Sequence, residues 1–113
     1  MENKIKRSVA TLLAHIIKID KRNLEKEEPL FCKLLGDDFN CNEGESKKLL
    51  QTILNEEYVL NDHIEIINSA LKDDKLSKMH ILKQFNHIIY SDKIKPRDYE
   101  EFERVKKALF PTI

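Results

Sequence analysis

The sequence predicts an all-α protein, a compact bundle of about six to seven helices. Apolar residues recur at spacings of three and four along most of the chain, which is the period of an amphipathic helix. Only two glycines and three prolines occur among 113 residues, whereas 35% of the residues are charged, and this balance favours helices over strands. A helix–acidic turn–helix pattern also occurs twice, which indicates a repeated supersecondary unit. At this length we expect one domain over residues 1–113.

The first unit spans residues 8–35. A helix is predicted over residues 4–19, because its apolar residues form one wide stripe: Ile5, Val9, Leu12, Leu13, Ile16 and Ile17. A break follows at residues 20–23, where Asn23 is suited to cap the next helix.

The second helix contains Pro29, which has no N–H and must lie near the start of a helix. This helix is therefore expected to begin at Glu25 or later. It should stop around Gly36, because glycine readily adopts the left-handed conformation that ends helices. A loop is then predicted over residues 37–42.

Two more helices are predicted in the middle of the chain. Asn42, with Glu45 three residues later, resembles a capping box and predicts a helix that continues to about Leu54. After a bend, Asn61 or Asp62 is suited to cap a fourth helix, whose inner face would carry four apolar residues: Ile64, Ile67, Ala70 and Leu71.

The second helix–acidic turn–helix unit spans residues 79–109, and Asp73 and Asp74 are suited to cap its first helix. The last helix should begin near Pro96 and end near Leu109. Lys95 occupies its N-cap position, where a serine or aspartate would be stronger, so we expect a frayed start there.

The two units align on their acidic residues. Asp20 and Asp92 each follow an apolar helix end. Glu27 comes seven residues after Asp20, and Asp98 comes six residues after Asp92. The difference of one residue falls in the turn, where a deletion is tolerated best.

The turn sequences resemble the tellurite-resistance TerB-like family, which includes the N-terminal domain of DjlA-type membrane co-chaperones. Residues 14–20, which read Ala-His-Ile-Ile-Lys-Ile-Asp, and Glu27 are similar to the signature A-x-x-x-x-A-D-G-x-(V/I/L)-x-x-x-E. Residues 88–98 are similar to a second signature that often reads D-G-x-L-x-P-E-E. The resemblance covers roughly residues 8–110.

Three positions depart from these signatures. Lys21 and Lys93 replace the glycine after each aspartate, and Asp98 replaces the second glutamate. The resemblance implies a non-enzymatic helical domain that acts through contacts with an unidentified protein partner, in stress response or with a co-chaperone-type system.

The acidic turn residues are the candidate metal site: Asp20, Glu27, Asp92 and Asp98. Hard cations such as Ca²⁺ and Mg²⁺ take oxygen ligands of this kind, and the resemblance implies divalent-cation binding at these positions in some members. The alternative is that each acid caps a helix end or pairs with a nearby cation: Lys21, Arg22, Lys93 or Arg97. A divalent-cation-binding module is therefore the second functional hypothesis.

Other sites find little support in the sequence. An EF-hand would need oxygen ligands two and four residues before each aspartate, where Ile16, Lys18, Ile88 and Tyr90 stand instead. The chain has no H-E-x-x-H zinc motif, no nucleophile–base order and no glycine-rich phosphate loop, so no enzyme is predicted. A groove between the two hairpins could accept a partner helix, lined by residues that could equally be core: Met79, Phe85 and Phe110.

Charge and hydropathy limit the partners and the location. A formal net charge of zero gives no electrostatic case for nucleic acid. Residues 37–74 nevertheless carry three basic and ten acidic residues, a net charge of −7, which either pairs with basic faces of the fold or faces a cation or basic partner. No apolar run of about 18 residues occurs, so we expect no membrane insertion and a cytoplasmic location.

Overall fold

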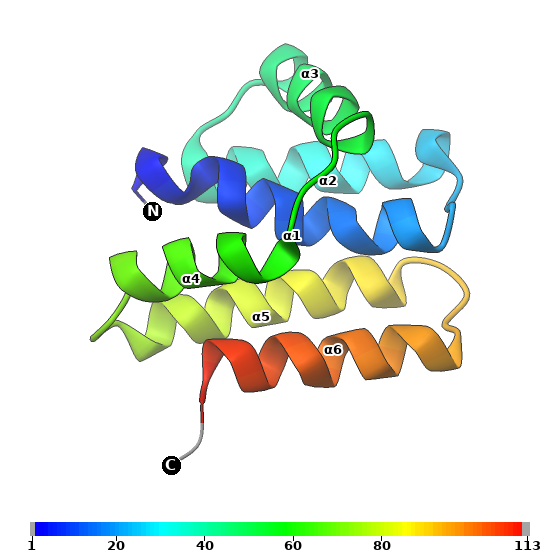
Figure 1. The fold of residues 1–113 in the computed structure, drawn as a ribbon. Coiled ribbons are helices and arrows are strands. Elements are labelled where there is room, and N and C mark those ends of the chain that lie inside the picture. Colours follow the sequence, from blue (N-terminus) through cyan, green and yellow to red (C-terminus); the bar gives the residue numbers. More distant parts are fainter. Residues whose placement is uncertain (1, 112–113) are drawn as a thin grey trace.

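The computed structural model describes residues 2–111, which form six α-helices after a short 3-10 turn, η1 (Asn3–Ile5) (Figure 1). The helices are α1 (Lys6–Ile19), α2 (Leu24–Phe39), α3 (Glu43–Leu54), α4 (Leu60–Ala70), α5 (Lys75–Tyr90) and α6 (Pro96–Leu109). No strand occurs within residues 2–111, which confirms the all-α prediction. The radius of gyration is 13.1 Å, close to the roughly 13 Å of a compact chain of this length.

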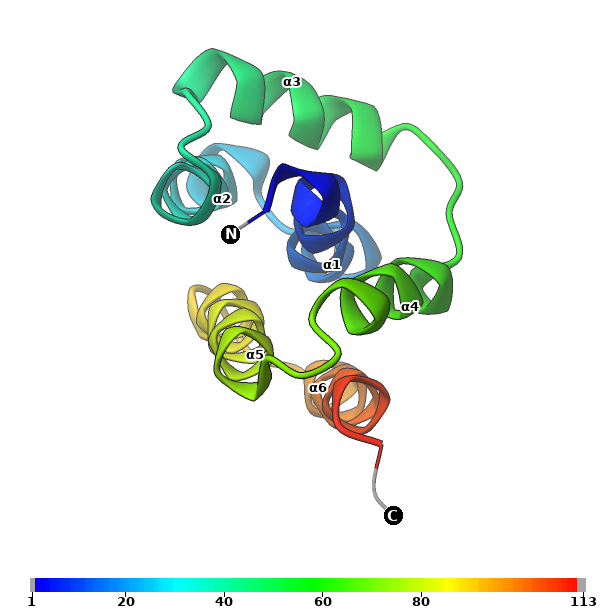
Figure 2. The same cartoon turned by 90° about the vertical axis from the view of Figure 1, so that its left-hand side faces the viewer.

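Helix α1 forms the centre of the bundle. Figure 2 shows it surrounded by α2, α3, α4 and α5. Nine of its residues are buried, including the hydroxyl residues Ser8 and Thr11. A helix that is apolar around most of its circumference is stable only inside a bundle, and the sequence of α1 has this character.

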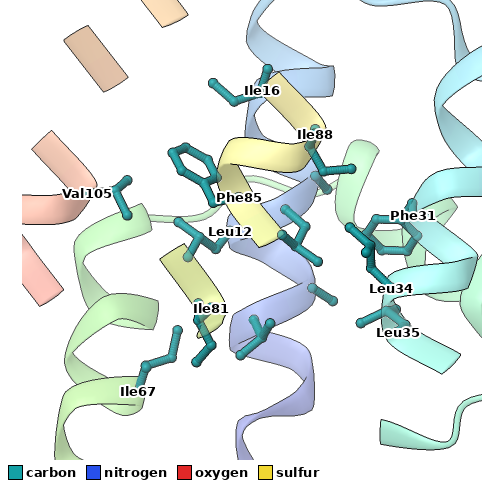
Figure 3. Packing of buried hydrophobic residues seen from close by; sticks show 14 of the residues in the cluster. Leu12, Ile16, Phe31, Leu34, Leu35, Ile67, Ile81, Phe85, Ile88 and Val105 are labelled. Atoms are coloured by element: carbon teal, nitrogen blue, oxygen red, sulfur yellow. The ribbon is translucent and has the colours of Figure 1, made fainter. Parts of the chain in front are cut away.

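The core joins α1 to its neighbours (Figure 3). Leu12 and Ile16 of α1 meet residues of α2, α4, α5 and α6: Phe31, Leu34, Leu35, Ile67, Ile81, Phe85, Ile88 and Val105. Burying one such side chain contributes about 1.5–3 kcal/mol. Phe85 is fully buried and stacks on Phe102 with ring centroids 6.4 Å apart, so it belongs to the core rather than to a groove.

Helix α2 differs from its prediction at both ends, because it begins at Leu24 rather than at Glu25 or later, and it continues through Gly36 to Phe39. The left-handed residue that ends it is Asn40, with φ of 54°, whose N–H donates to the Gly36 carbonyl at 3.0 Å. The predicted stop at Gly36 is therefore wrong. Asparagine also tolerates the left-handed conformation, so it can take the role that glycine usually has.

Two helices differ from expectation in how their first turns are capped. Helix α4 begins at Leu60, and Val59 at its N-cap makes no side-chain cap, so neither Asn61 nor Asp62 caps it. Helix α6 begins at Pro96 as predicted, and the Asp98 carboxylate closes its first turn by accepting the Lys95 N–H at 2.9 Å. Asp98 thus supplies the N3 half of a capping box.

The two acidic turns lie at the same end of the bundle, on the right of Figure 1. One turn joins α1 to α2, and the other joins α5 to α6. Because α1 packs against α5 and α2 also packs against α5, the two helix–turn–helix units bring their turns together. Within residues 2–111, no helix has both the length and the apolar character that crossing a membrane would require.

Candidate functional site

The guanidinium of Arg22 lies at the point where the two acidic turns meet. Its side chain is only 3% exposed. It donates from Nη1 to the Ile88 carbonyl at 2.7 Å and from Nη2 to the Ile89 carbonyl at 3.1 Å, at the C-terminal end of α5. A residue of the first turn therefore closes the last turn of a helix in the second unit, where the helix dipole favours a positive charge.

Three of the four predicted acids converge on this guanidinium. Asp20 Oδ2 lies 3.4 Å from Arg22 Nε, Glu27 Oε1 lies 3.5 Å from Nη1, and Asp98 Oδ2 lies 3.1 Å from Nη2. The side chains of all three acids are fully buried. We call this group, together with Ser91, the turn network.

The local backbone conformation directs the carboxylates of all three acids into the turn network. Lys21 adopts the left-handed conformation with φ of 49°, and the chain reverses so that the Arg22 N–H donates to the Ile17 carbonyl at 3.0 Å. Glu27 follows in the first turn of α2, and its Oε2 accepts a hydrogen bond from Ser91 Oγ at 2.6 Å. Asp98 is held by the Lys95 N–H of its own helix start. The network thus combines ion pairing with helix capping.

Asp92, the fourth predicted ligand, lies apart from the network. Its Oδ1 accepts hydrogen bonds from the Lys93 N–H at 2.7 Å and from Lys26 Nζ at 3.1 Å. These two donors, the backbone N–H first, lower the pKa of Asp92 below its usual value. The cation that pairs with Asp92 is therefore Lys26, which is not among the four that the alternative named.

Three carboxylates surround the Arg22 guanidinium, and Arg97 Nη1 adds only a 4.0 Å contact to Asp20 Oδ1, so the network is rich in negative charge. Burial, followed by the adjacent Asp98 carboxyl, raises the pKa of Asp20. Burial alone would also raise the pKa of Asp98, but the neighbouring Asp20 carboxyl, the Lys95 N–H and Arg22 lower it. Oδ1 of Asp20 and Oδ1 of Asp98 are both buried without a hydrogen-bond donor. A proton on Asp20 would supply that donor.

With Arg22 in place, the turn network does not fit a divalent cation. Its guanidinium occupies the space between the three carboxylates, and only two oxygens remain without a donor, Asp20 Oδ1 and Asp98 Oδ1. Ca²⁺ takes roughly six to eight oxygen ligands and Mg²⁺ about six. Among residues 2–111, no group of three or more His, Cys, Asp or Glu side chains is arranged to hold a metal ion.

A second polar cluster links α1 to the segment between α3 and α4 and to the first turn of α4. The Tyr58 hydroxyl lies 2.9 Å from His15 Nδ1, and His63 Nδ1 lies 2.9 Å from Ser8 Oγ. Burial is the main cause that lowers the pKa of both histidines, and burial raises the pKa of Tyr58 to about 12. Ser8 is only 3% exposed, so its contact with His63 places no nucleophile where a substrate could reach it.

A groove that the sequence analysis missed runs along the outer side of α4. Its volume is about 610 Å³, and six residues that line it are Ile5, Asp62, Glu65, Ile66, Ser69 and Ala70. Ile66 is 46% exposed. The signal was present in the sequence, because Ile66 falls outside the inner stripe that Ile64 and Ile67 define.

The chain matches no family model, no curated protein and no solved structure. Function is therefore inferred from the turn network, the surface of the bundle and the sequence resemblance.

Proposed function

We propose that the chain is a non-enzymatic TerB-like helical domain that acts through protein–protein contacts, in stress response or with a co-chaperone-type system. The family assignment is supported by the turn signatures around Asp20 and Asp92. Their two turns are also the parts of the fold that meet, and Lys21 has the left-handed conformation that the signature glycine would favour.

The observation that carries the contact role is the groove along α4. An isoleucine that is 46% exposed, Ile66, lines this groove together with Asp62 and Glu65. Neither carboxylate makes an ion pair or a side-chain hydrogen bond within residues 2–111. An apolar side chain exposed in a concave, charged setting is typical of a protein-binding surface.

A non-catalytic role is supported by how the chemically active groups are used. Glu27 and Asp98 are engaged by Arg22, Ser91 and a helix N-terminus. Ser8, which contacts His63, is buried by the fold. These groups contribute to folding stability, which leaves the surface as the part of the chain available for function.

The test is capture of partners from native lysate with the immobilised chain, followed by titration of each purified candidate by calorimetry. We expect at least one protein to bind saturably with one-to-one stoichiometry. The bait should be checked by far-UV circular dichroism. If a folded bait yields no candidate that binds in the titration, the contact role is wrong.

Divalent-cation binding through the acidic turns is the second candidate. It is favoured by the two buried oxygens without donors, Asp20 Oδ1 and Asp98 Oδ1. It requires the Arg22 side chain to leave the network. An amide NMR titration with Ca²⁺, Mg²⁺ and Zn²⁺ tests it: saturable shifts clustered at residues 20–28 and 92–98 would support a site. Weak scattered shifts, or unchanged affinity after combined Asp20→Ala and Glu27→Ala substitution, would refute it.

A further inference from the structure

The groove along α4 continues beyond the helix into the turn before α5. A second hollow of about 520 Å³ shares Ser69 and Ala70 with the first and extends past Leu71 to Asp74. Together they follow α4, whose 11 residues span about 16 Å at 1.5 Å per residue. This length matches about three turns of a helix lying alongside.

The exposed apolar residue of this groove, Ile66, is not covered by the core of the same chain. Ile64 and Ile67 are 2% and 0% exposed and point into the bundle. Ile66 lies about 100° from Ile67 around the helix and therefore faces outward. Ala70, one turn further along α4, also lines the groove and is partly buried against the core. The groove thus offers a narrow apolar strip with one large side chain.

The rim of the groove is acidic. Its charged lining comprises five acids and two lysines, which gives a net charge of −3: Glu2, Asp62, Glu65, Asp73 and Asp74 against Lys4 and Lys72. Two of these acids are already engaged: Glu2 pairs with Lys4 at 3.2 Å, and Asp74 caps α5.

The other three acids, Asp62, Glu65 and Asp73, make no ion pair or side-chain hydrogen bond within the described chain. Elsewhere in the acidic middle of the chain, Glu43, Glu45 and Glu56 each pair with a lysine or arginine. The groove is therefore a place where negative charge is left uncompensated beside exposed apolar surface.

We propose that this groove binds a basic amphipathic helix of a partner protein. The proposal deepens the contact role proposed above and rests on it. The apolar face of the partner helix covers Ile66 and Ala70, and its flanking lysines or arginines pair with Asp62, Glu65 and Asp73. The negative rim repels nucleic acid and anionic lipid head groups, which leaves a cationic helix as the complementary surface.

The binding test uses a defined probe, a fluorescein-labelled 14-residue helix of leucine and lysine with leucine at i, i+3, i+4 and i+7. A matched peptide with glutamate in place of lysine is the control. Fluorescence anisotropy should show saturable binding of the lysine peptide, weakened by added salt, and no binding of the glutamate peptide. Amide NMR shifts should cluster at the residues that line the groove, within 2–5 and 62–77.

Two variants of the groove test separately how much its charge and its apolar strip contribute to the affinity. Charge reversal at Asp62→Lys with Glu65→Lys should weaken binding by about tenfold or more, and so should Ile66→Asp. The matched controls lie on α6: Glu100→Lys with Glu103→Lys has the same spacing and charge change at exposed positions, and Tyr99→Asp removes an exposed apolar side chain. These controls should change the affinity less than twofold.

Several outcomes would overturn the proposal. They are equal loss of affinity in the α6 controls, unchanged binding by Ile66→Asp, or NMR shifts that cluster away from the groove, outside residues 2–5 and 62–77. A dimer in light scattering that Ile66→Asp abolishes would make a second copy of the chain the occupant instead. If native partners bind but the groove variants do not weaken them, the contact role stands and the groove assignment fails. If the probe binds in the groove but no native partner is found, the contact role fails by its own test.

Discussion

Arg22 and Asp98 are 76 positions apart in the chain, yet Arg22 Nη2 donates to Asp98 Oδ2 at 3.1 Å. The same guanidinium donates to the carbonyls of Ile88 and Ile89. One side chain of the first turn therefore holds both the end of α5 and the start of α6. A planar fork of several donors suits this role, because a lysine could not reach these acceptors simultaneously.

Replacing Arg22 with alanine should destabilise the fold by about 3–5 kcal/mol, because it leaves buried carboxylates without their cation. Arg22→Lys should cost less, since it keeps the charge and loses only the fork. Urea denaturation followed by circular dichroism measures both.

Arg104 provides the matched control for Arg22. Its side chain is 47% exposed and pairs with Glu101 on the surface of α6. Arg104→Ala should therefore change the free energy of unfolding by less than about 1 kcal/mol. A loss at Arg22→Ala no larger than this would mean that the turn network does not stabilise the fold.

Replacement by asparagine should reduce the free energy of unfolding by different amounts at Asp20 and at Asp98. The pKa of Asp20 is raised and that of Asp98 is lowered, so a neutral side chain is better tolerated at position 20. Asp20→Asn can donate to Asp98 and should cost less than about 1 kcal/mol. Asp98→Asn weakens the acceptor of both Arg22 and the Lys95 N–H, and should cost about 2–3 kcal/mol. Equal losses in urea denaturation at pH 7 would contradict this assignment.

The convergence of Asp20 and Glu27 followed from the turn pattern, but the separation of Asp92 did not. In the alignment of the two units, Arg22 stands two residues after Asp20, and the equivalent position after Asp92 is Ile94. The guanidinium of the second unit, Arg97, comes later in the chain and reaches the first turn, where it donates to the Ile19 carbonyl at 2.7 Å and lies 4.0 Å from Asp20 Oδ1. No arginine of the described chain therefore forms an ion pair with Asp92, which pairs with Lys26 instead. Sequence similarity between the units could not indicate which acid would be left out.

Each of the two interpretations of the acidic segment 37–74 holds for some of its acids. Glu43, Glu45 and Glu56 pair within the fold, as one of the two interpretations predicted. Asp62 and Glu65 do not pair within the described chain, which fits the other interpretation. Which acids find a partner depends on distances between helices, and these cannot be read from local sequence.

Replacing the two lysines that stand at the signature glycine positions with glycine should change the stability of the fold in opposite directions. Lys21 has φ of 49°, whereas Lys93 is not in the left-handed region. Lys21→Gly should stabilise the fold by about 0.5–1 kcal/mol, because the relief of strain exceeds the added entropy of the unfolded chain.

At position 93 glycine gains nothing in the folded state and only loosens the unfolded chain. Lys93→Gly should therefore destabilise the fold by about 0.5–1 kcal/mol. Thermal unfolding of the two variants side by side gives a direct comparison. A shift of the same sign in both would contradict the conformational difference between the turns.

The cluster around Tyr58 should make the fold less stable as the pH falls from 7.5 to 5.5. Burial is the main cause that lowers the pKa of His15 and His63 below the usual 6.5, with Arg104 and Lys18 adding to the effect at His15 and Arg7 at His63. In this window the unfolded chain takes up protons that the folded chain does not. The free energy of unfolding therefore decreases, by at most about 1.4 kcal/mol per pH unit for each histidine.

Asparagine at both positions tests this pH dependence, because its side chain can replace the hydrogen bond made by Nδ1 but does not titrate. The double variant His15→Asn with His63→Asn should lose most of the decrease between pH 7.5 and 5.5 in urea denaturation. Its circular dichroism at pH 7.5 must match that of the unsubstituted chain. If the double variant is folded and keeps the same slope, the protons are taken up elsewhere, and the Tyr58 cluster does not determine the pH response.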